Sequence, residues 1–283
     1  MTQDKRTGAV LDYYNAHPIS EQQILEKLQR DGLNSKDLTE DILQNYDQDH
    51  YGGTDANDAL AELTGLRESD HVLDVCCGLG GPSRYLAHKY DCRVTGIDLT
   101  ESRIVGARRL TEMTRLDGRV DFQTGNALSM PFEDATFDVL ISQEAFCHIP
   151  DKGQLVAECA RVTKPDGRFA FTDILVTPRV TEDIRTRLLA GMAFQELNST
   201  ESYAATLERE GFEVVEVQNL AEPWRIILSE RLKMYRGLKD QTVERYGQAH
   251  FDKWDSAYSF FVGLYETGEL SGGRFLARRR PAT

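Results

Sequence analysis

The chain has 283 residues and a formal net charge of −13, with 46 Asp and Glu against 33 Lys and Arg. A protein that binds nucleic acid normally presents a basic face, so this charge argues against DNA or RNA as a partner. The sequence shows no apolar run of membrane-spanning length and no amino-terminal signal pattern, and we expect a cytoplasmic protein that binds no membrane. The length suits one large domain, or one domain with a lid, and we expect a monomer or a homodimer.

Five cysteines are present, of which Cys76 and Cys77 are adjacent and the other three are isolated. No pair has the C-x-x-C spacing, and no group of Cys and His has the spacing of a zinc site. We therefore expect reduced, mostly buried thiols and no bound metal.

Residues 1–55 are expected to form a helical lid ahead of the first core strand. The first 17 residues are polar and indicate an irregular segment, although two tyrosines interrupt it. Ser20 and Gln23 have the spacing of a capping box, and the apolar residues behind them share one helical face, which predicts a helix. A second short helix is expected at 38–43. Both helices would pack over an edge of the core, because neither can bury its apolar face alone.

Residues 45–53 read Asn-Tyr-Asp-Gln-Asp-His-Tyr-Gly-Gly and combine aromatic and acidic side chains with a Gly-Gly turn. This composition is compatible with an ordinary surface loop. However, loops at the carboxyl ends of strands carry function in α/β folds, and this loop precedes the first core strand. We therefore expect Tyr46 and Tyr51 to face the active site, with a helix at 56–66 leading to the strand.

Residues 70–100 organise the rest of the chain. An apolar run at 72–75 is typical of a buried parallel strand, and a glycine-rich turn follows at 78–81. Pro82 stands where a helix can begin, and a second apolar run ends at Asp98. This order of strand, glycine turn, helix, strand and acid suits a nucleotide-type ligand. Glycines let the backbone approach the ligand closely, and the acid can accept both ribose hydroxyls.

Strands and helices alternate through the remaining residues, which predicts a doubly wound, mainly parallel sheet. A tight turn is expected at 164–167, where the sequence reads Lys-Pro-Asp-Gly. A long helical insertion is expected at 221–268, followed by a closing edge strand at 272–278. The other expected helices are at 102–116, 153–162, 184–197 and 199–210, and the other strands at 120–124, 137–142, 168–175 and 211–217.

Residues 73–80 read Leu-Asp-Val-Cys-Cys-Gly-Leu-Gly and closely resemble motif I of class I S-adenosylmethionine-dependent methyltransferases, whose usual form is LDxGxGxG. Cys76 stands where that family has its first glycine. The resemblance extends over about 45–280 and implies S-adenosylmethionine as cofactor. It also implies a Rossmann-like, seven-stranded core at 56–283 whose last strand inserts antiparallel.

The resemblance also implies how the cofactor is held. Asp98 matches the acid that accepts the ribose hydroxyls. Gly125-Asn126-Ala127 matches a Gly-Asp-Ala stretch whose acid accepts from the adenine amino group, and the Asn126 side-chain oxygen could do the same. The expected cofactor residues are Asp74, Cys76, Gly78, Gly80, Asp98, Leu99, Asn126, Ala127 and Gln143.

Residues 142–148, Ser-Gln-Glu-Ala-Phe-Cys-His, look like the S-x-D/E-x-x-x-H stretch of N-methyltransferases that act on sarcosine, dimethylglycine and phosphoethanolamine. The resemblance implies a catalytic pair, Tyr46 and His148. A histidine with a tyrosine partner can take a proton from an amine near neutral pH. Transfer to a tertiary amine or to a thioether leaves a cation, which aromatic rings and carboxylates stabilise. The expected acceptor-binding residues are Tyr51, Glu144, Trp224 and Tyr258.

The acceptor stays open between several classes. An amino-acid-derived osmolyte is expected first, either a sarcosine-like or dimethylglycine-like amine or the thioether of methionine. An O-methyltransferase or a phosphobase methyltransferase of secondary metabolism is the alternative. A non-catalytic cofactor-binding protein and a Rossmann oxidoreductase are further alternatives. For Trp224 and Tyr258 the alternative to a role in acceptor binding is ordinary core packing. For His148 the alternative to a catalytic role is capping of the helix that follows.

Overall fold

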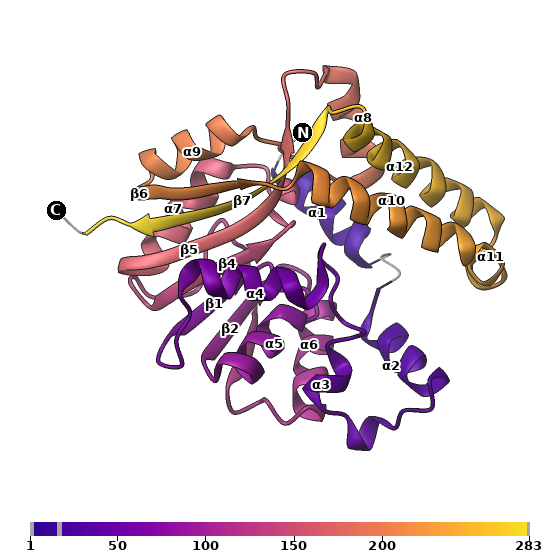
Figure 1. Cartoon of the computed structure of the whole chain (residues 1–283), viewed down its shortest axis with the longest axis horizontal. Helices are drawn as coiled ribbons and strands as arrows, with labels where there is room; N and C mark the ends of the chain where they lie inside the picture. The colour runs from indigo at the N-terminus through magenta and orange to yellow at the C-terminus, as the bar shows by residue number, and fades with distance from the viewer. Residues whose placement is uncertain (1–2, 16–18, 282–283) are drawn as a thin grey trace.

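A seven-stranded sheet forms the centre of the structure, and helices cover both of its faces (Figure 1). The computed structural model describes residues 3–15 and 19–281. The strands are β1 (His71–Val75), β2 (Arg93–Asp98), β3 (Val120–Thr124), β4 (Phe137–Gln143), β5 (Thr163–Val176), β6 (Phe212–Asn219) and β7 (Leu270–Arg279).

The strand order is β3-β2-β1-β4-β5-β7-β6. The first five strands pair in parallel, whereas β7 pairs antiparallel with both β5 and β6. The expected doubly wound, Rossmann-like methyltransferase fold is therefore confirmed. The expectation that the last strand lies at the edge is wrong, because β7 inserts between β5 and β6 and leaves β6 outermost.

Helices precede, alternate with and follow the strands, as the pattern predicts. Short 3-10 turns occur at Ser35–Asp37 and Phe146–His148. The α-helices are α1 (Gln3–Asn15), α2 (Glu21–Arg30), α3 (Glu40–Leu43), α4 (Gly53–Thr64), α5 (Gly81–Tyr90), α6 (Glu101–Met113), α7 (Lys152–Val162), α8 (Glu182–Met192), α9 (Thr200–Arg209), α10 (Ala221–Gly237), α11 (Lys239–Tyr246) and α12 (Gln248–Glu266).

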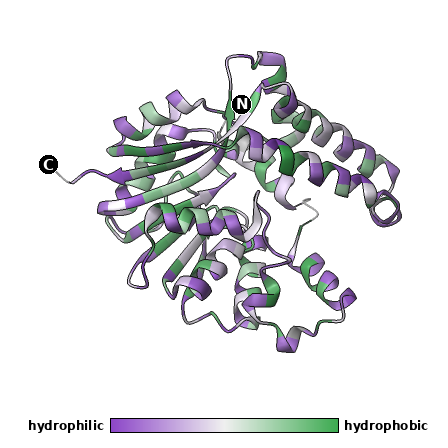
Figure 2. Cartoon of the chain, in the orientation of Figure 1, coloured by the Kyte–Doolittle hydropathy of each residue, from purple (hydrophilic) through white to green (hydrophobic). Residues whose placement is uncertain are grey.

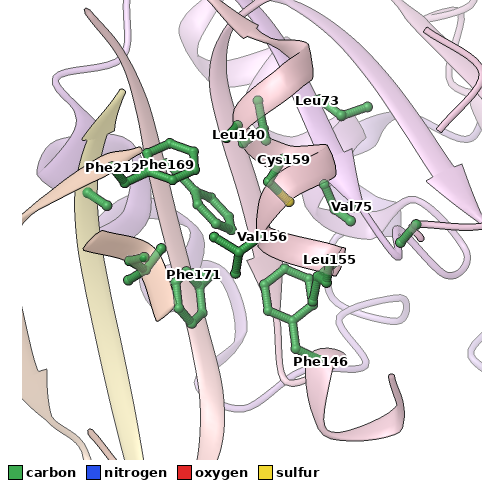
Figure 3. Close-up of a cluster of buried hydrophobic side chains, with 14 of the residues drawn as sticks. Leu73, Val75, Leu140, Phe146, Leu155, Val156, Cys159, Phe169, Phe171 and Phe212 are labelled. Carbon is green, nitrogen blue, oxygen red and sulfur yellow. The ribbon is translucent and has the colours of Figure 1, made fainter. Parts of the chain in front are cut away.

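Two apolar layers sandwich the sheet. Side chains of α4, α5 and α6 pack on one face, and those of α7 and α9 pack on the other. Figure 3 shows Leu155, Val156 and Cys159 of α7 against side chains of β1, β4 and β5, including Phe169 and Phe171. Hydrophobic residues accordingly occupy the strands, and hydrophilic residues follow the outer sides of the helices (Figure 2). Within the described ranges, no helix has both the length and the apolar character needed to cross a bilayer.

Two local expectations need correction. Residues 3–15 form helix α1 instead of an irregular segment. The rings of Tyr13 and Tyr14 stabilise this helix through tertiary contacts, which the periodicity of the sequence does not reveal. Residues 164–167 form a bulge within β5 instead of a tight turn ahead of a strand that begins at 168. The pairing steps from Phe137 opposite Thr163 to Val139 opposite Arg168, so β5 carries the extra residues. Asp166 absorbs the bend with a φ of 61°.

The expected helix after Ser20 is confirmed, because the Ser20 hydroxyl accepts from the Gln23 backbone N–H at the start of α2. The helices α2 and α3 share a small apolar cluster with Leu79 and Leu110. The helical insertion before the last strand is also confirmed as α10, α11 and α12. These three helices contact one another and extend beyond the sheet, with α1 beside them (Figure 1).

Candidate active site

The turn after β1 has the backbone that a close ligand approach requires. Cys76, Gly78 and Gly80 all adopt left-handed φ values, of 66°, 55° and 75°. A side chain at Gly80 would place its Cβ 2.3 Å from Cζ of Phe122, so only glycine fits there. Cys76 adopts the left-handed conformation of the glycine it replaces, held by a hydrogen bond from its N–H to the Ile97 carbonyl at 2.8 Å.

Asp98 is the last residue of β2, and backbone N–H groups orient both oxygens of its carboxylate. One oxygen accepts from the Gly78 N–H at 3.0 Å, and the other accepts from the Thr100 N–H at 2.8 Å. Each carboxylate oxygen can accept more than one hydrogen bond, so both retain capacity toward the cavity. This geometry suits two neighbouring hydroxyls of a ribose.

Asp74 lies beneath the same turn and is buried. Its carboxylate accepts from the Ser83 hydroxyl at 2.5 Å. Burial raises the pKa of Asp74 to about 7, the Ser83 hydrogen bond opposes this shift, and the nearby charge of Asp98 adds to it. A positively charged ligand group close to Asp74 would therefore lower its pKa.

The loop before α4 is tied to the cofactor turn by buried polar contacts. Asp47 accepts from the guanidinium of Arg84 at 2.7 Å, and both side chains are fully buried. Asp47 also accepts from Gln48, whose side-chain oxygen lies 2.9 Å from Nε2 of His50. The Gln143 amide in turn lies 3.0 Å from Nδ1 of His50. Burial lowers the pKa of His50 to about 4, so this ring is neutral and relays hydrogen bonds.

Arg103 of α6 connects three segments above the cofactor turn. Its guanidinium donates to Asp49 at 3.2 Å and lies over the ring of Tyr14, 4.8 Å from the centroid. It also comes within 3.3 Å of the space that a Cβ on Gly78 would occupy. Helix α1 and the loop are therefore joined to the turn through one buried cation.

Glu144 follows β4 in a left-handed conformation, with a φ of 47°. Its carboxylate accepts from the Tyr51 N–H at 2.6 Å and from the Thr172 hydroxyl at 2.5 Å. Burial raises the pKa of Glu144 to about 7, whereas these hydrogen bonds and the charge of Arg231 lower it. Arg231 of α10 donates to the His50 carbonyl and lies 5.0 Å from the Tyr51 ring centroid.

His148 is buried among rings. Its Nδ1 lies 3.2 Å from the Ala193 carbonyl oxygen, a contact in which Nδ1 donates its proton. The centroids of Tyr14 and Phe194 lie 5.2 Å from that of His148, and the Tyr13 centroid lies 5.9 Å away. The tyrosines beside His148 in the described contacts therefore come from α1.

Tyr46 lies in a different setting from the one the resemblance implies. Its hydroxyl donates to Asp31 at 2.7 Å, and this hydrogen bond raises the pKa of Tyr46. Its ring packs on the apolar cluster of α2 and α3. Trp224 lies behind the cavity wall, where it packs on Gly272 and contacts the Tyr51 ring edge-on at 5.0 Å.

One cavity of about 650 Å³ joins most of these residues. All of the expected cofactor residues except Gly80 line it, as do Tyr46, Tyr51, Glu144, His148 and Tyr258. Sequence reasoning missed several residues that line the cavity. The 45–53 motif could have drawn attention to Asp49 and His50, since both lie inside it. No sequence signal marks Tyr13, Tyr14, Arg103, Arg231 or Trp254, which are among the other lining residues.

Comparison with known proteins agrees with this geometry. The family described as a methyltransferase domain matches residues 73–171. The chain is also 30% identical over 202 residues to 27-O-demethylrifamycin SV methyltransferase of Amycolatopsis mediterranei, covering 70% of this chain and 74% of that protein. The chain belongs to the S-adenosylmethionine-dependent methyltransferases. The methyltransferase is thus an enzyme, and its cofactor is S-adenosylmethionine. This family membership decides against the two other classes considered from the sequence, a Rossmann oxidoreductase and a non-catalytic cofactor-binding protein.

Other relatives differ in the acceptor that their names give. The methyltransferase is 31% identical over 150 residues to sarcosine/dimethylglycine N-methyltransferase of Halorhodospira halochloris, covering 53% of this chain and 54% of that protein. Among solved structures, Haemonchus contortus phosphoethanolamine N-methyltransferase 2 in complex with S-adenosyl-L-methionine has a TM-score of 0.74 at 21% identity. The match covers 96% of this chain and 60% of that chain, and it supports the fold alone.

Proposed function

We propose that the methyltransferase moves the methyl group of S-adenosylmethionine to a proton-bearing heteroatom of a small metabolite, with His148 as the proton acceptor. The observation that carries this proposal is the continuity of the cavity. It runs from the glycine turn and Asp98, past Gln143, to His148 and the rings of α1 and α12. Cofactor and acceptor can therefore meet in one continuous cavity, which methyl transfer requires.

The inner half of the cavity fits the cofactor. Asp98 would accept the ribose hydroxyls, and Asn126 with Ala127 would meet the adenine. The Asn126 side-chain oxygen accepts from the Leu128 N–H at 2.9 Å, which holds it in place and leaves a second lone pair. Within the described residues, the Gln143 side-chain oxygen is buried without a hydrogen-bond partner, and a polar ligand group would satisfy it. The bound cofactor supplies an activated methyl group.

The residues of this chain orient the acceptor and handle its proton. The Ala193 carbonyl orients the His148 ring, and in the proposed reaction this imidazole takes a proton from a hydroxyl or an amine. Tyr13, Tyr14 and Phe194 restrict the ring and exclude water around it. Tyr46 contributes to this arrangement as a wall residue of the lid.

An osmolyte-type amine or thioether is the second candidate acceptor. It is favoured by the rings of Tyr51 and Tyr258 together with the carboxyl of Glu144, which could stabilise a cationic product. A thioether would need only positioning, because it has no proton to lose.

A panel of acceptors with methyl-labelled cofactor tests the proposal. The panel holds sarcosine, dimethylglycine, methionine, phosphoethanolamine and a set of aryl and alkyl alcohols and amines. We expect labelled product from a hydroxyl or amine compound, with transfer lowered by His148→Ala. Labelling of methionine alone would contradict the role given to His148. Binding of S-adenosylhomocysteine without transfer to any class would contradict the proposed reaction.

A further inference from the structure

The outer half of the cavity has walls of a different character from the inner half. Along α10 to α12 its lining includes the uncharged apolar and aromatic side chains Met234, Tyr235, Leu238, Tyr246, Trp254 and Tyr258, together with Thr242, His250 and one cation, Arg231. The facing wall includes Ile174, Met192 and Phe194 from the core side and Val10 from α1. A ligand that enters this half therefore meets mostly aliphatic and aromatic surface.

The cationic side chains of the cavity wall are Lys27, Arg103 and Arg231 in the part of the chain that the structure describes. Arg103 already donates to Asp49, and Arg231 donates to the His50 carbonyl and covers Tyr51. Lys27 lies on the exposed side of α2. A carboxylate or phosphate on the acceptor would have to compete with these partners at Arg103 and Arg231, whereas an uncharged body would not.

The mouth of the cavity exposes large apolar side chains. Met234 is 63% exposed, and Leu238 and Tyr246 are each 42% exposed, although all three line the cavity. Met234 is in the last turn of α10, Leu238 joins α10 to α11, and Tyr246 ends α11. These elements form the end of the arm that extends beyond the sheet (Figure 1). Ile226 is 51% exposed on the same helix but lies outside the cavity lining, so exposure by itself does not mark the mouth.

We infer that the acceptor is amphipathic, with its nucleophile beside His148 and an uncharged apolar body laid between α1 and the arm of α10 to α12. Part of this body reaches the mouth and covers Met234, Leu238 and Tyr246, which accounts for an exposed apolar rim continuous with the cavity. This inference rests on the proposed function and adds the chemical class of the acceptor, which excludes small zwitterions such as sarcosine.

A homologous series of primary alcohols with six, eight, ten and twelve carbons tests the length dependence. Binding is measured by calorimetry on the full chain saturated with S-adenosylhomocysteine. Each added methylene that becomes buried should tighten binding by about threefold to fourfold. We expect this increase up to the chain length that reaches the mouth. Affinity that does not change with length, or sarcosine bound more tightly than decanol, would overturn the inference.

Matched variants locate the apolar body. The double variant Met234→Gln, Leu238→Gln keeps side-chain size and charge but removes apolar surface at the mouth, and Ile226→Gln makes the same change elsewhere on α10. We expect the double variant to weaken the binding of dodecanol at least fivefold and that of hexanol less than twofold. Its affinity for S-adenosylhomocysteine should not change. Ile226→Gln should leave all three ligands unchanged. An equal loss of dodecanol affinity in the double variant and in Ile226→Gln would overturn the inference.

Two further readouts separate the possible failures. Light scattering reports the oligomeric state, and a dimer that the double variant dissociates would show that a second copy of the chain, not the acceptor, covers the mouth. Labelled transfer to sarcosine, together with alcohol affinity that does not change with chain length, would refute the inference of an apolar acceptor. The proposed reaction would then still stand. Absence of S-adenosylhomocysteine binding in the wild-type protein would instead refute the proposed function.

Discussion

Gly80→Ala should destabilise the protein through the cofactor turn, and Gly32→Ala is its matched control. Both glycines have nearly the same left-handed φ, 75° at Gly80 and 77° at Gly32. A Cβ at Gly32 meets nothing within 4 Å, whereas a Cβ at Gly80 would lie 2.3 Å from Cζ of Phe122. The comparison therefore separates backbone strain, which both variants share, from the steric clash, which only one has.

The clash at Gly80 has no easy relief. Carbon atoms in contact normally lie about 3.5–4.0 Å apart, so the Phe122 ring would have to move by roughly 1 Å. The Phe122 ring is also packed closely on Gly96, where a Cβ would come within 2.6 Å of the ring. Arg84 also lies 3.0 Å from the new Cβ position, and it holds the buried contact to Asp47.

The two contributions give the expected magnitudes. Left-handed strain on alanine costs about 1 kcal/mol after the smaller entropy of the unfolded chain is included. Overpacking at Phe122 adds about 1–3 kcal/mol. Gly32→Ala should therefore lose about 1 kcal/mol and Gly80→Ala about 2–4 kcal/mol of unfolding free energy.

Urea unfolding followed by circular dichroism, with no cofactor present, measures both values. Calorimetry adds a second readout, because only Gly80→Ala should weaken the binding of S-adenosylhomocysteine. If the two variants lose the same unfolding free energy within about 0.5 kcal/mol, the steric reasoning is refuted.

Three other predictions concern single side chains. Asp98→Ala should weaken the binding of S-adenosylhomocysteine by about 2–3 kcal/mol, since it removes charge-assisted hydrogen bonds. Unchanged affinity in calorimetry would refute this role of Asp98. His148→Ala should lower kcat well below the wild-type value, whereas Tyr46→Phe should change kcat little, because the Tyr46 hydroxyl binds Asp31. Equal loss of rate in both variants would restore the pair implied by the resemblance. Burial raises the pKa of Asp74 to about 7, above the ~3.9 of an unfolded chain, so the folded state holds the extra proton. Its contribution to the unfolding free energy therefore falls as pH rises from about 4 to 7, and Asp74→Asn should flatten that part of the profile in thermal unfolding at stepped pH. A slope that the variant leaves unchanged would contradict this assignment.

The core and the cofactor turn could be predicted from the sequence because their determinants are local. The apolar run of β1, the glycines at 78–81 and the acid at Asp98 lie within thirty residues of one another, and each follows from φ preference or strand period. Cys76 is the exception, since it adopts a left-handed φ that a residue with a Cβ does not favour.

Only the tertiary structure decided the surroundings of His148. Tyr13 and Tyr14 reach it from more than 130 residues away, in a segment whose composition indicates no helix, while Tyr46 bonds to Asp31. The place of β7 inside the sheet likewise depends on pairing with β5 and β6 across long sequence separations. Local pattern specifies which residues form a strand or a helix. Contacts between distant elements decide the order of strands and which side chains meet in the cavity, and those contacts depend on the packing of the whole fold.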